Sequence, residues 1–226
     1  RANFEAKDGN RMDAPAKGNA LEAGTVAEAY LRLLADRGVD CLFANAGTDF
    51  APLIEAYARS GEGVATPRPV TVPHENVAVA MAMGHWLISR RMQAVMVHVN
   101  VGTANTICGI LNAARANIPI LVTAGRTPLN ETGLEGQRNL HIHWTQEMYD
   151  QAAMLREVVK WDYELRTSAQ LEIVVDRALS VAKAAPFGPV YLTLPREVLA
   201  TRLPAPLKVQ PAGRRIAPAP PGADPD

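Results

Sequence analysis

The sequence lacks an excess of either charge, a disulfide framework and any long apolar run. Its 226 residues carry 23 basic and 23 acidic side chains, so no electrostatic footprint for nucleic acid or an anionic membrane is present. Cys41 and Cys108 are the only cysteines, and we expect buried free thiols, which suit a reducing cytoplasm. No apolar stretch approaches the roughly 18 to 20 residues that cross a bilayer, and the polar start has no signal-peptide core. We therefore expect a soluble cytoplasmic protein that acts on small molecules, with neither a nucleic acid nor a membrane as partner.

The sequence also lacks a dinucleotide motif and the length for two domains. A nicotinamide-binding fold needs Gly-x-Gly-x-x-Gly after an early strand, so that pyrophosphate sits on a helix N-terminus, but Gly47 and Gly102 each stand alone. Domains commonly run to about 100 to 200 residues, so one α/β domain plus tails fits and a second full domain does not. The chain begins with Arg1 instead of Met, which predicts that it is part of a longer protein.

What is present is an alternation of helical and strand-like apolar spacing. Runs such as 94–97 are apolar on both faces, as strands of a parallel sheet covered by helices should be. In the helix predicted over 76–90, Met81, Met83 and Trp86 have the spacing of core residues. We expect an α/β protein, a three-layer α/β/α sandwich with a mostly parallel central sheet. The predicted helices are 25–38, 52–58, 76–90, 103–116, 146–158 and 169–184, and the predicted strands are 41–44, 70–72, 94–99, 120–123 and 190–194.

Composition changes sharply at both ends of this pattern. Residues 1–22 are rich in Ala, Asn, Gly, Lys and Asp without periodicity, which predicts a mobile N-terminal segment. Residues 201–226 are rich in Pro and Ala, and proline removes backbone donors and favours extended chain. We expect a linker or tail there, without regular sheet or helix, and one domain over 23–200.

Glu75 is a lone carboxylate where an apolar strand gives way to an Ala-rich helix. The run around it reads Val-Thr-Val-Pro-His-Glu-Asn-Val-Ala and holds no other acidic residue. Ligands of α/β sheets bind beyond the carboxyl ends of strands, and Gly47, Glu75 and Gly102 fall at such turns. A carboxyl group sheltered from water can keep its proton near neutrality and pass it to a ring nitrogen. The simpler alternative is that Glu75 only complements the helix dipole. His74 and His98 are weaker candidates, and a hydrogen-bonded structural histidine is the simpler interpretation of His74.

Four ordered segments carry a resemblance to a known family. Segments 42–50, 73–75 and 99–105 follow one another, and the closing segment 188–197 reads Gly-Pro-Val-Tyr-Leu-Thr-Leu-Pro-Arg-Glu. Over residues 24–200 the chain resembles the pyrimidine-binding (Pyr) domain of thiamine-diphosphate enzymes of the acetolactate synthase and pyruvate decarboxylase superfamily. The resemblance implies a homo-oligomer, at least a dimer, with the active site between two chains.

The resemblance also implies roles for particular residues. Glu75 would hydrogen-bond N1′ of the aminopyrimidine and promote the tautomer whose exocyclic nitrogen removes the thiazolium C2 proton. Gly47 and Thr48 stand in the family's Phe-Gly-x-Pro-Gly-Gly turn, and Gly102 and Asn105 in its Gly-Pro-Gly-Ala-Thr-Asn motif, so the resemblance implies cofactor contacts at all four. Both motifs are altered here, and a structural turn or a helix-closing polar group remains the alternative.

The loop 140–147 holds the candidate substrate residues. Trp-Thr-Gln-Glu, with Gln146, is similar to the Phe-Gln-Glu segment that faces the substrate in acetolactate synthases. His141 and His143 resemble the adjacent His-His pair of pyruvate decarboxylases, although Ile142 separates them. Exposed or hydrogen-bonded loop histidines are the alternative. His-x-His can also bind a metal, but no third ligand lies at a supporting spacing, so we predict no metal site in this chain.

The family's metal-binding segment is missing. These enzymes hold Mg²⁺ and the diphosphate with Gly-Asp-Gly followed later by Asn, on a separate domain, and no Gly-Asp-Gly occurs here. The resemblance therefore implies a diphosphate-binding domain on a missing C-terminal part or on a separate subunit. It implies an acetolactate-synthase-like enzyme, dependent on thiamine diphosphate and Mg²⁺, that decarboxylates a 2-keto acid and can ligate the product to a second carbonyl compound. FAD occurs in such enzymes, but nothing in this sequence supports it. The alternatives are a non-catalytic Pyr-type module for assembly or regulation and the small subunit of a two-chain keto-acid decarboxylase.

Overall fold

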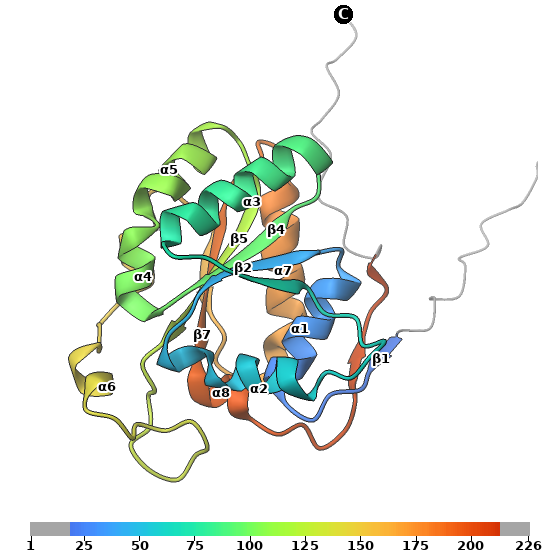
Figure 1. Cartoon of the computed structure of the whole chain (residues 1–226), viewed down its shortest axis with the longest axis vertical. Coiled ribbons are helices and arrows are strands. Elements are labelled where there is room, and N and C mark those ends of the chain that lie inside the picture. The colour runs from blue at the N-terminus through green and yellow to red at the C-terminus, as the bar shows by residue number, and fades with distance from the viewer. Residues whose placement is uncertain (1–18, 213–226) are drawn as a thin grey trace, which may run out of the picture.

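A six-stranded sheet forms the centre of the structure, a computed structural model that describes residues 19–212 (Figure 1). The strands lie in the order β3-β2-β4-β5-β7-β6, and every neighbouring pair is parallel. All six therefore end at one edge of the sheet, which we call the carboxyl edge. The strands are β2 (Cys41–Asn45), β3 (Arg68–Thr71), β4 (Gln93–Val97), β5 (Ile120–Arg126), β6 (Asp162–Glu164) and β7 (Val190–Pro195).

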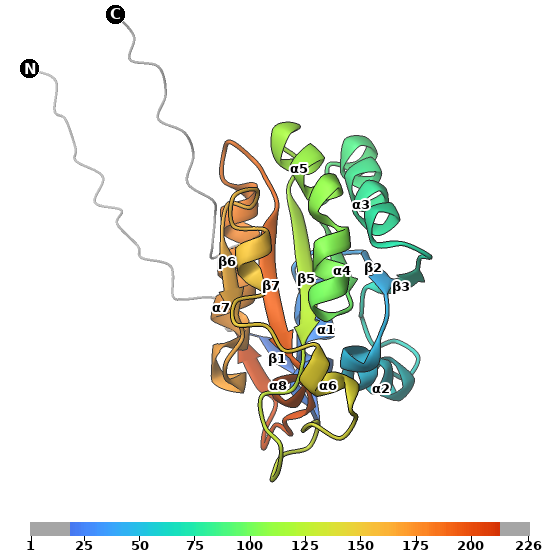
Figure 2. The ribbon, with the colours of Figure 1, turned by 90° about the vertical axis from the view of Figure 1, so that its left-hand side faces the viewer.

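Helices cover both faces of this sheet, which gives three layers (Figure 2). Strands β4 and β7 are buried along their whole length, as parallel strands covered on both sides must be. The predicted α/β/α sandwich with a mostly parallel sheet is confirmed. One face carries α3 (Glu75–Ser89), α4 (Val99–Asn105) and α5 (Ile107–Arg115), and the other carries α1 (Val26–Asp36) and α7 (Leu171–Lys183), with α2 (Ala51–Arg59) and α8 (Arg196–Ala200) against α1.

Most predicted elements agree with the structure to within a few residues at each end. The first helix shows why its boundaries were readable. Thr25 caps α1, its Oγ1 accepting the backbone N–H of Glu28 at 3.3 Å, and Gly38 follows the helix with a left-handed φ of +82°. The cap residue and the glycine are both local signals, so no tertiary information was needed to find them.

The helix predicted over 103–116 is two helices, and it begins earlier than predicted. Helix α4 starts at Val99, with His98 alone between it and β4, and Thr106 separates it from α5. The Thr106 hydroxyl donates to the carbonyl of Thr103 at 2.7 Å, a local side-chain bond that competes with a continuous helical ladder. The loop that opens the second family motif is therefore helical here.

The helix predicted over 146–158 is wrong. The segment holds only turns and one 3₁₀ turn, Ala152–Met154. Gln151 is 3 % exposed, and its Nε2 donates to the carbonyl of Gly125 at 2.9 Å and to the hydroxyl of Tyr191 at 2.8 Å. These tertiary bonds hold the chain in an irregular path, and they override a helical pattern that is only a local preference.

The expectation of no regular structure in either tail is also wrong. β1 (Asn19–Leu21) pairs antiparallel with β8 (Leu207–Val209), and the pair joins the two ends of the described chain. Leucine and valine alternate with lysine in β8, and Val209 is 1 % exposed, so a short apolar alternation survives among the prolines. The remainder of both tail predictions, residues 1–18 and 213–226, lies outside the described residues.

Two predictions of burial fail on the outer helix layer. Cys41 is buried as expected, but Cys108 on α5 is exposed; both thiols are free. On α3, Trp86 is 9 % exposed and packs as a core residue, whereas Met81 is 39 % exposed. Cys108 and Met81 lie on the side of the helix layer that faces away from the sheet.

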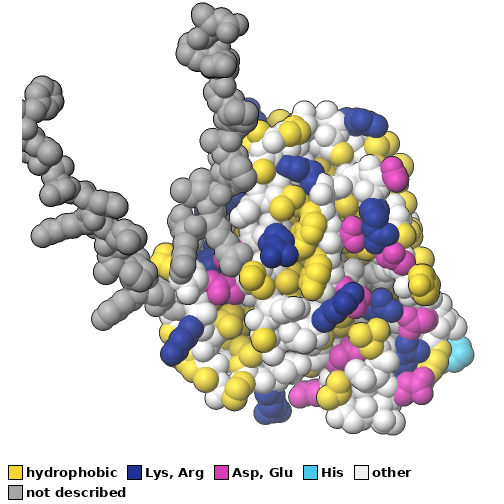
Figure 3. All heavy atoms as spheres, turned by 180° about the vertical axis from the view of Figure 1, so that it is seen from behind, with side chains coloured by type: hydrophobic (Ala, Val, Ile, Leu, Met, Phe, Trp, Pro, Cys, Tyr) yellow, Lys and Arg dark blue, Asp and Glu magenta, His cyan; other side chains and the backbone are white. Residues whose placement is uncertain are grey.

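The opposite side of the molecule shows hydrophobic side chains scattered among charged ones (Figure 3). Basic and acidic side chains intermingle on it, with no field of one sign (Figure 3). Within residues 19–212, none of the helices combines the length and the apolarity that crossing a bilayer requires.

Candidate functional site

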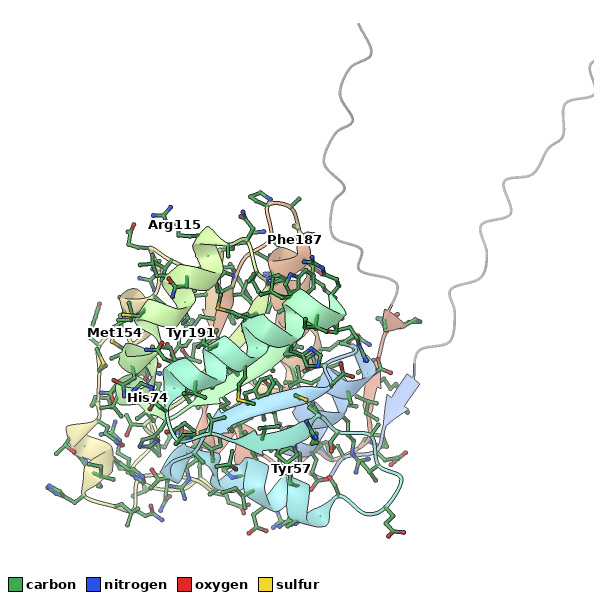
Figure 4. All side chains as sticks on the ribbon, turned by 45° about the horizontal axis from the view of Figure 1, so that its top comes forward. Tyr57, His74, Arg115, Met154, Phe187 and Tyr191 are labelled. Carbon is green, nitrogen blue, oxygen red and sulfur yellow. The ribbon has the colours of Figure 1, made fainter. Side chains whose placement is uncertain are left out.

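The carboxyl edge of the sheet holds Glu75 in a sheltered position. Glu75 is the first residue of α3, and His74 before it caps the helix, its Nδ1 accepting the backbone N–H of Asn76 at 3.1 Å (Figure 4). The Glu75 side chain is only 10 % exposed. Asn105 Nδ2, at the end of α4, donates to Glu75 Oε2 at 3.1 Å. Among the described residues no hydrogen bond reaches Oε1, so this oxygen is available to a ligand.

A buried polar network fixes the helix that carries Asn105. Thr103 Oγ1 lies 2.8 Å from the hydroxyl of Tyr191 on β7, and Gln151 Nε2 donates to the same hydroxyl at 2.8 Å. All three side chains are at most 3 % exposed. A satisfied network of this kind rigidifies its surroundings, so α4 presents Asn105 to Glu75 in one orientation.

A second polar cluster lies at the same edge, after β2, β4 and β5. His98 directly follows β4, and its Nδ1 lies 2.6 Å from Oδ1 of Asp49, which is 2 % exposed. Its Nε2 lies 3.0 Å from Nε2 of Gln146. The other Asp49 oxygen accepts the backbone N–H of Val99 at 3.3 Å. The cluster thus runs from a buried carboxylate to a half-buried amide through one imidazole ring.

Two glycines make room for this cluster. A side chain on Gly47 would overlap the imidazole of His98, and one on Gly125 would overlap the carboxylate of Asp49. The space that a side chain at position 47 would occupy is therefore filled by His98. Gly102 has its own packing reason, because a Cβ there would lie 3.0 Å from Cβ of Val97.

The structure brings some of the predicted site residues together and separates others. Glu75 and Asn105 are in contact, and Thr48 is exposed on the turn after Gly47, at the same edge. Gln146 joins this edge through His98. The cofactor contacts of Gly47, Thr48 and Gly102 stay predictions.

The two loop histidines do not form a pair. His141 is exposed, whereas His143 is 1 % exposed and its Nδ1 accepts the backbone N–H of Asn139 at 3.3 Å. Its Nε2 lies 3.5 Å from a guanidinium nitrogen of Arg196. The alternative of one exposed and one hydrogen-bonded loop histidine describes these positions, and their substrate role stays a prediction.

The lowered pKa of His143 predicts that the fold loses stability in acid. Burial lowers the pKa of His143 from its usual value, and the nearby cations of Arg196 and Arg138 lower it further. Because the unfolded chain then binds a proton more readily than the folded chain, this contribution to stability is complete above the unfolded pKa of about 6.5 and is lost as the pH falls towards the folded pKa. Chemical denaturation at pH 7 and pH 5 should show a smaller loss of unfolding free energy for His143→Gln than for the unsubstituted chain. An equal loss in both would contradict this role.

Asp49 and His98 are the functional candidates that sequence reasoning missed or undervalued. They stand 49 positions apart, and no motif joins them. The available signal was topological: both follow strands, β2 and β4, that are hydrogen-bonded neighbours in a parallel sheet. Polar residues after neighbouring strands meet at the carboxyl edge, but the strand order had to be known first.

The parallel α/β sandwich and the sheltered polar groups at its carboxyl edge define the class of a cofactor- or substrate-binding α/β domain. The chain belongs to the thiamine pyrophosphate enzymes: the model of their N-terminal TPP binding domain matches residues 24–154. The resemblance found in the sequence is thereby confirmed.

Curated relatives agree with this family. The chain is 25 % identical to a benzoylformate decarboxylase of Pseudomonas aeruginosa, over 85 % of this chain and 37 % of the relative. It is 27 % identical to a sulfoacetaldehyde acetyltransferase of Rhodobacter capsulatus, over 77 % and 27 %. It is 28 % identical to the large subunit of acetolactate synthase isozyme 3 of Escherichia coli, over 81 % and 30 %. The chain spans about a third of the length of these relatives.

A solved structure shares the fold. The thiamine diphosphate-dependent 4-hydroxybenzoylformate decarboxylase of Rhodococcus jostii matches with a TM-score of 0.67 at 24 % identity, over 80 % of this chain and 32 % of that one. The covered 32 % of that protein lies within the 27 to 37 % covered in the sequence relatives.

Proposed function

We propose that this chain supplies the pyrimidine half of a thiamine-diphosphate site, in an enzyme that decarboxylates a 2-keto acid and can ligate the product to a second carbonyl compound. The observation that carries the proposal is Glu75, whose carboxylate is sheltered, held at Oε2 by Asn105 and open at Oε1. Within this proposal, residues 23–200 are the Pyr domain, with the β1–β8 pair added beside it.

The residues at the carboxyl edge fit an aminopyrimidine. When bound, thiamine diphosphate supplies a carbon that adds to a keto acid and holds the electrons released on decarboxylation. Glu75 Oε1 would share a proton with ring nitrogen N1′, while Asn105 keeps the carboxyl group facing the ring. Thr48 and the turn at Gly47 lie at the same edge and would border the ring. The low exposure of Glu75 matters because water would otherwise compete for the same proton.

The diphosphate half of the site needs a further domain. Among residues 19–212, no three acidic, histidine or cysteine side chains gather in a way that would hold a metal ion. We propose that Mg²⁺ and the diphosphate bind to a partner domain, on the same polypeptide or on a separate subunit. The length of the curated relatives, about three times that of this chain, supports the first arrangement.

Exposed apolar side chains on the outer helix layer support an oligomer. Helix α3 exposes Met81 to 39 %, Leu87 to 53 % and Ile88 to 90 %, although its other face is already buried on the sheet. A helix that is apolar on all sides is normally buried on all sides. We propose that this layer packs against a second protein domain in the assembled enzyme. A complete protein that sediments strictly as a monomer, with α3 accessible, would contradict this.

The relatives and the loop around Gln146 support a substrate class, and the free cysteines support a location. The relatives include a decarboxylase named for benzoylformate, which is a 2-keto acid, and acetolactate synthases. Gln146, held next to His98, supports a substrate-facing loop of the acetolactate-synthase kind. Both cysteines are free thiols, which supports a location in the reducing cytoplasm.

Calorimetric titration of the complete protein with thiamine diphosphate and Mg²⁺ tests the proposal. We expect saturable binding that weakens when Asn105→Ala removes the support of Glu75. A matched control is Asn130→Ala, because Asn130 lies on a loop that contacts Glu197 and not Glu75. A non-catalytic module is the conclusion if the complete protein binds no cofactor, or binds it with an affinity that neither Asn105→Ala nor Glu75→Gln changes.

A further inference from the structure

We propose that Asp49 is a positioning residue: it holds His98 in the tautomer that carries its proton on Nδ1, so that the lone pair of Nε2 can accept a proton at the carboxyl edge. The inference rests on the proposed function for its chemistry, but its geometry stands apart from the cofactor. It assigns a role to two residues, Asp49 and His98, to which the resemblance gave none.

The tautomer follows from the partners of the two ring nitrogens. An ionised carboxylate only accepts hydrogen bonds, and Asp49 Oδ1 lies 2.6 Å from Nδ1, so Nδ1 must donate. The amide nitrogen of Gln146 only donates, and it lies 3.0 Å from Nε2, so Nε2 must accept. Both contacts require the same neutral imidazole, with its proton on Nδ1.

The packing shows that the arrangement is built into the fold. Asp49 is 2 % exposed and has room only because residue 125 is a glycine, and His98 has room only because residue 47 is a glycine. Asp49 also accepts the N–H of Val99, which has a positive φ of 33°. Strain at a β-branched residue of this kind persists only where its surroundings enforce it. The carboxylate therefore fixes both the ring and the backbone next to it.

The ring links this buried carboxylate to the surface of the site. His98 is 19 % exposed at its side chain, so it can be reached from the edge although Asp49 cannot. Helix α4 begins directly after His98 and ends at Asn105, the partner of Glu75. The seven residues of α4 span about 10 Å, which is the separation of the two polar clusters along the helix.

The side-chain amide of Gln146 can reorient when His98 gains a proton. Its Oε1 is buried and has no hydrogen-bond partner in the described part of the chain, next to the amide nitrogen that meets His98. If Nε2 takes a proton from a bound acid or hydroxyl group, Nδ1–H stays with Asp49, and the carboxylate offsets the new positive charge. Rotation of the amide by half a turn would then place Oε1 opposite the new N–H. The proton moves between ligand and Nε2, and no other bond changes.

Imidazole ¹⁵N spectra of the complete protein with labelled histidine test the tautomer directly. We expect the ring of His98, assigned by the loss of its signals in His98→Gln, to be neutral with its proton on Nδ1. Asp49→Asn should remove this preference. Gln146→Leu should keep it, because the ring proton is held from the Asp49 side, and this variant leaves the buried carboxylate in place. A proton on Nε2 in the unsubstituted protein, or a tautomer that changes in Gln146→Leu but not in Asp49→Asn, would overturn the inference.

A double-substitution cycle separates positioning from simple folding. In the complete protein, Asp49→Asn should lower kcat by roughly 10²- to 10⁴-fold, and the double variant Asp49→Asn/His98→Gln should turn over no more slowly than His98→Gln alone. Asp150→Asn is the control, since Asp150 pairs with Arg156 away from this cluster. Multiplicative losses in the double variant would contradict positioning. Absence of any thiamine-diphosphate-dependent turnover would contradict the proposed function. The imidazole ¹⁵N spectra would still decide the role of Asp49.

Discussion

Glu75→Gln in the complete protein is expected to lower kcat by roughly 10²- to 10⁴-fold, the range that a positioned proton-transfer group contributes. Glutamine has nearly the same shape, and its side-chain oxygen can still accept the bond from Asn105, so the local packing should survive. It cannot pass a proton to a ring nitrogen. The loss should therefore appear in turnover, while the melting temperature changes little.

The matched control for this substitution is Glu55→Gln. Glu55 lies on α2 with 65 % of its side chain exposed, so the same chemical change there should leave turnover unaltered. If Glu75→Gln retained full turnover with the same substrates, the assignment of Glu75 as the proton partner of the cofactor would be wrong.

Gly125→Ala is expected to destabilise the fold by about 1 to 3 kcal/mol, the usual range for adding a methyl group to a packed interior. The new Cβ would overlap the side chain of Asp49, which is 2 % exposed and cannot move into solvent. Relief requires the carboxylate to shift away from His98, so the substitution should lower both the melting temperature and the turnover of the complete protein. Thermal unfolding and steady-state kinetics measure the two effects.

Gly61→Ala provides the matched control. Gly61 lies in the loop after α2, and nothing lies within 4 Å of the position where its Cβ would be. Alanine there should change the free energy of unfolding by less than about 1 kcal/mol, because no packed side chain has to move. If Gly125→Ala were as harmless as Gly61→Ala, the tight packing around Asp49 would be refuted.

Five strands of the sheet and most of its helices were predictable because their signals are local, whereas β6 was not predicted. Strands such as β4 are apolar at every position, and α1 carries both a threonine cap and a terminal glycine. The segment 146–158 has the same apolar periodicity as a helix, but the buried bonds of Gln151 decide its path. Those partners lie far away in the sequence. A pattern within one segment cannot report them.

The same distinction divides the candidate site. Glu75 was predictable because a single acid between a strand and a helix is visible in the sequence, and Asn105 was found through a motif. The Asp49–His98 pair depends on which strands are neighbours, and the burial of His143 depends on Arg196 and Asn139 folding around it. Strand order and loop closure are properties of the whole chain, so these features needed the structure.

The most direct test is the rate at which the C2 proton of bound thiamine diphosphate exchanges with deuterium, read by proton spectra after acid quenching of the complete protein in D₂O. If Glu75 shares its proton with the pyrimidine, exchange should be fast in the unsubstituted protein and slower by roughly 10²- to 10⁴-fold in Glu75→Gln, with cofactor still bound. Equal exchange rates in the two proteins, both saturated with cofactor, would contradict the account.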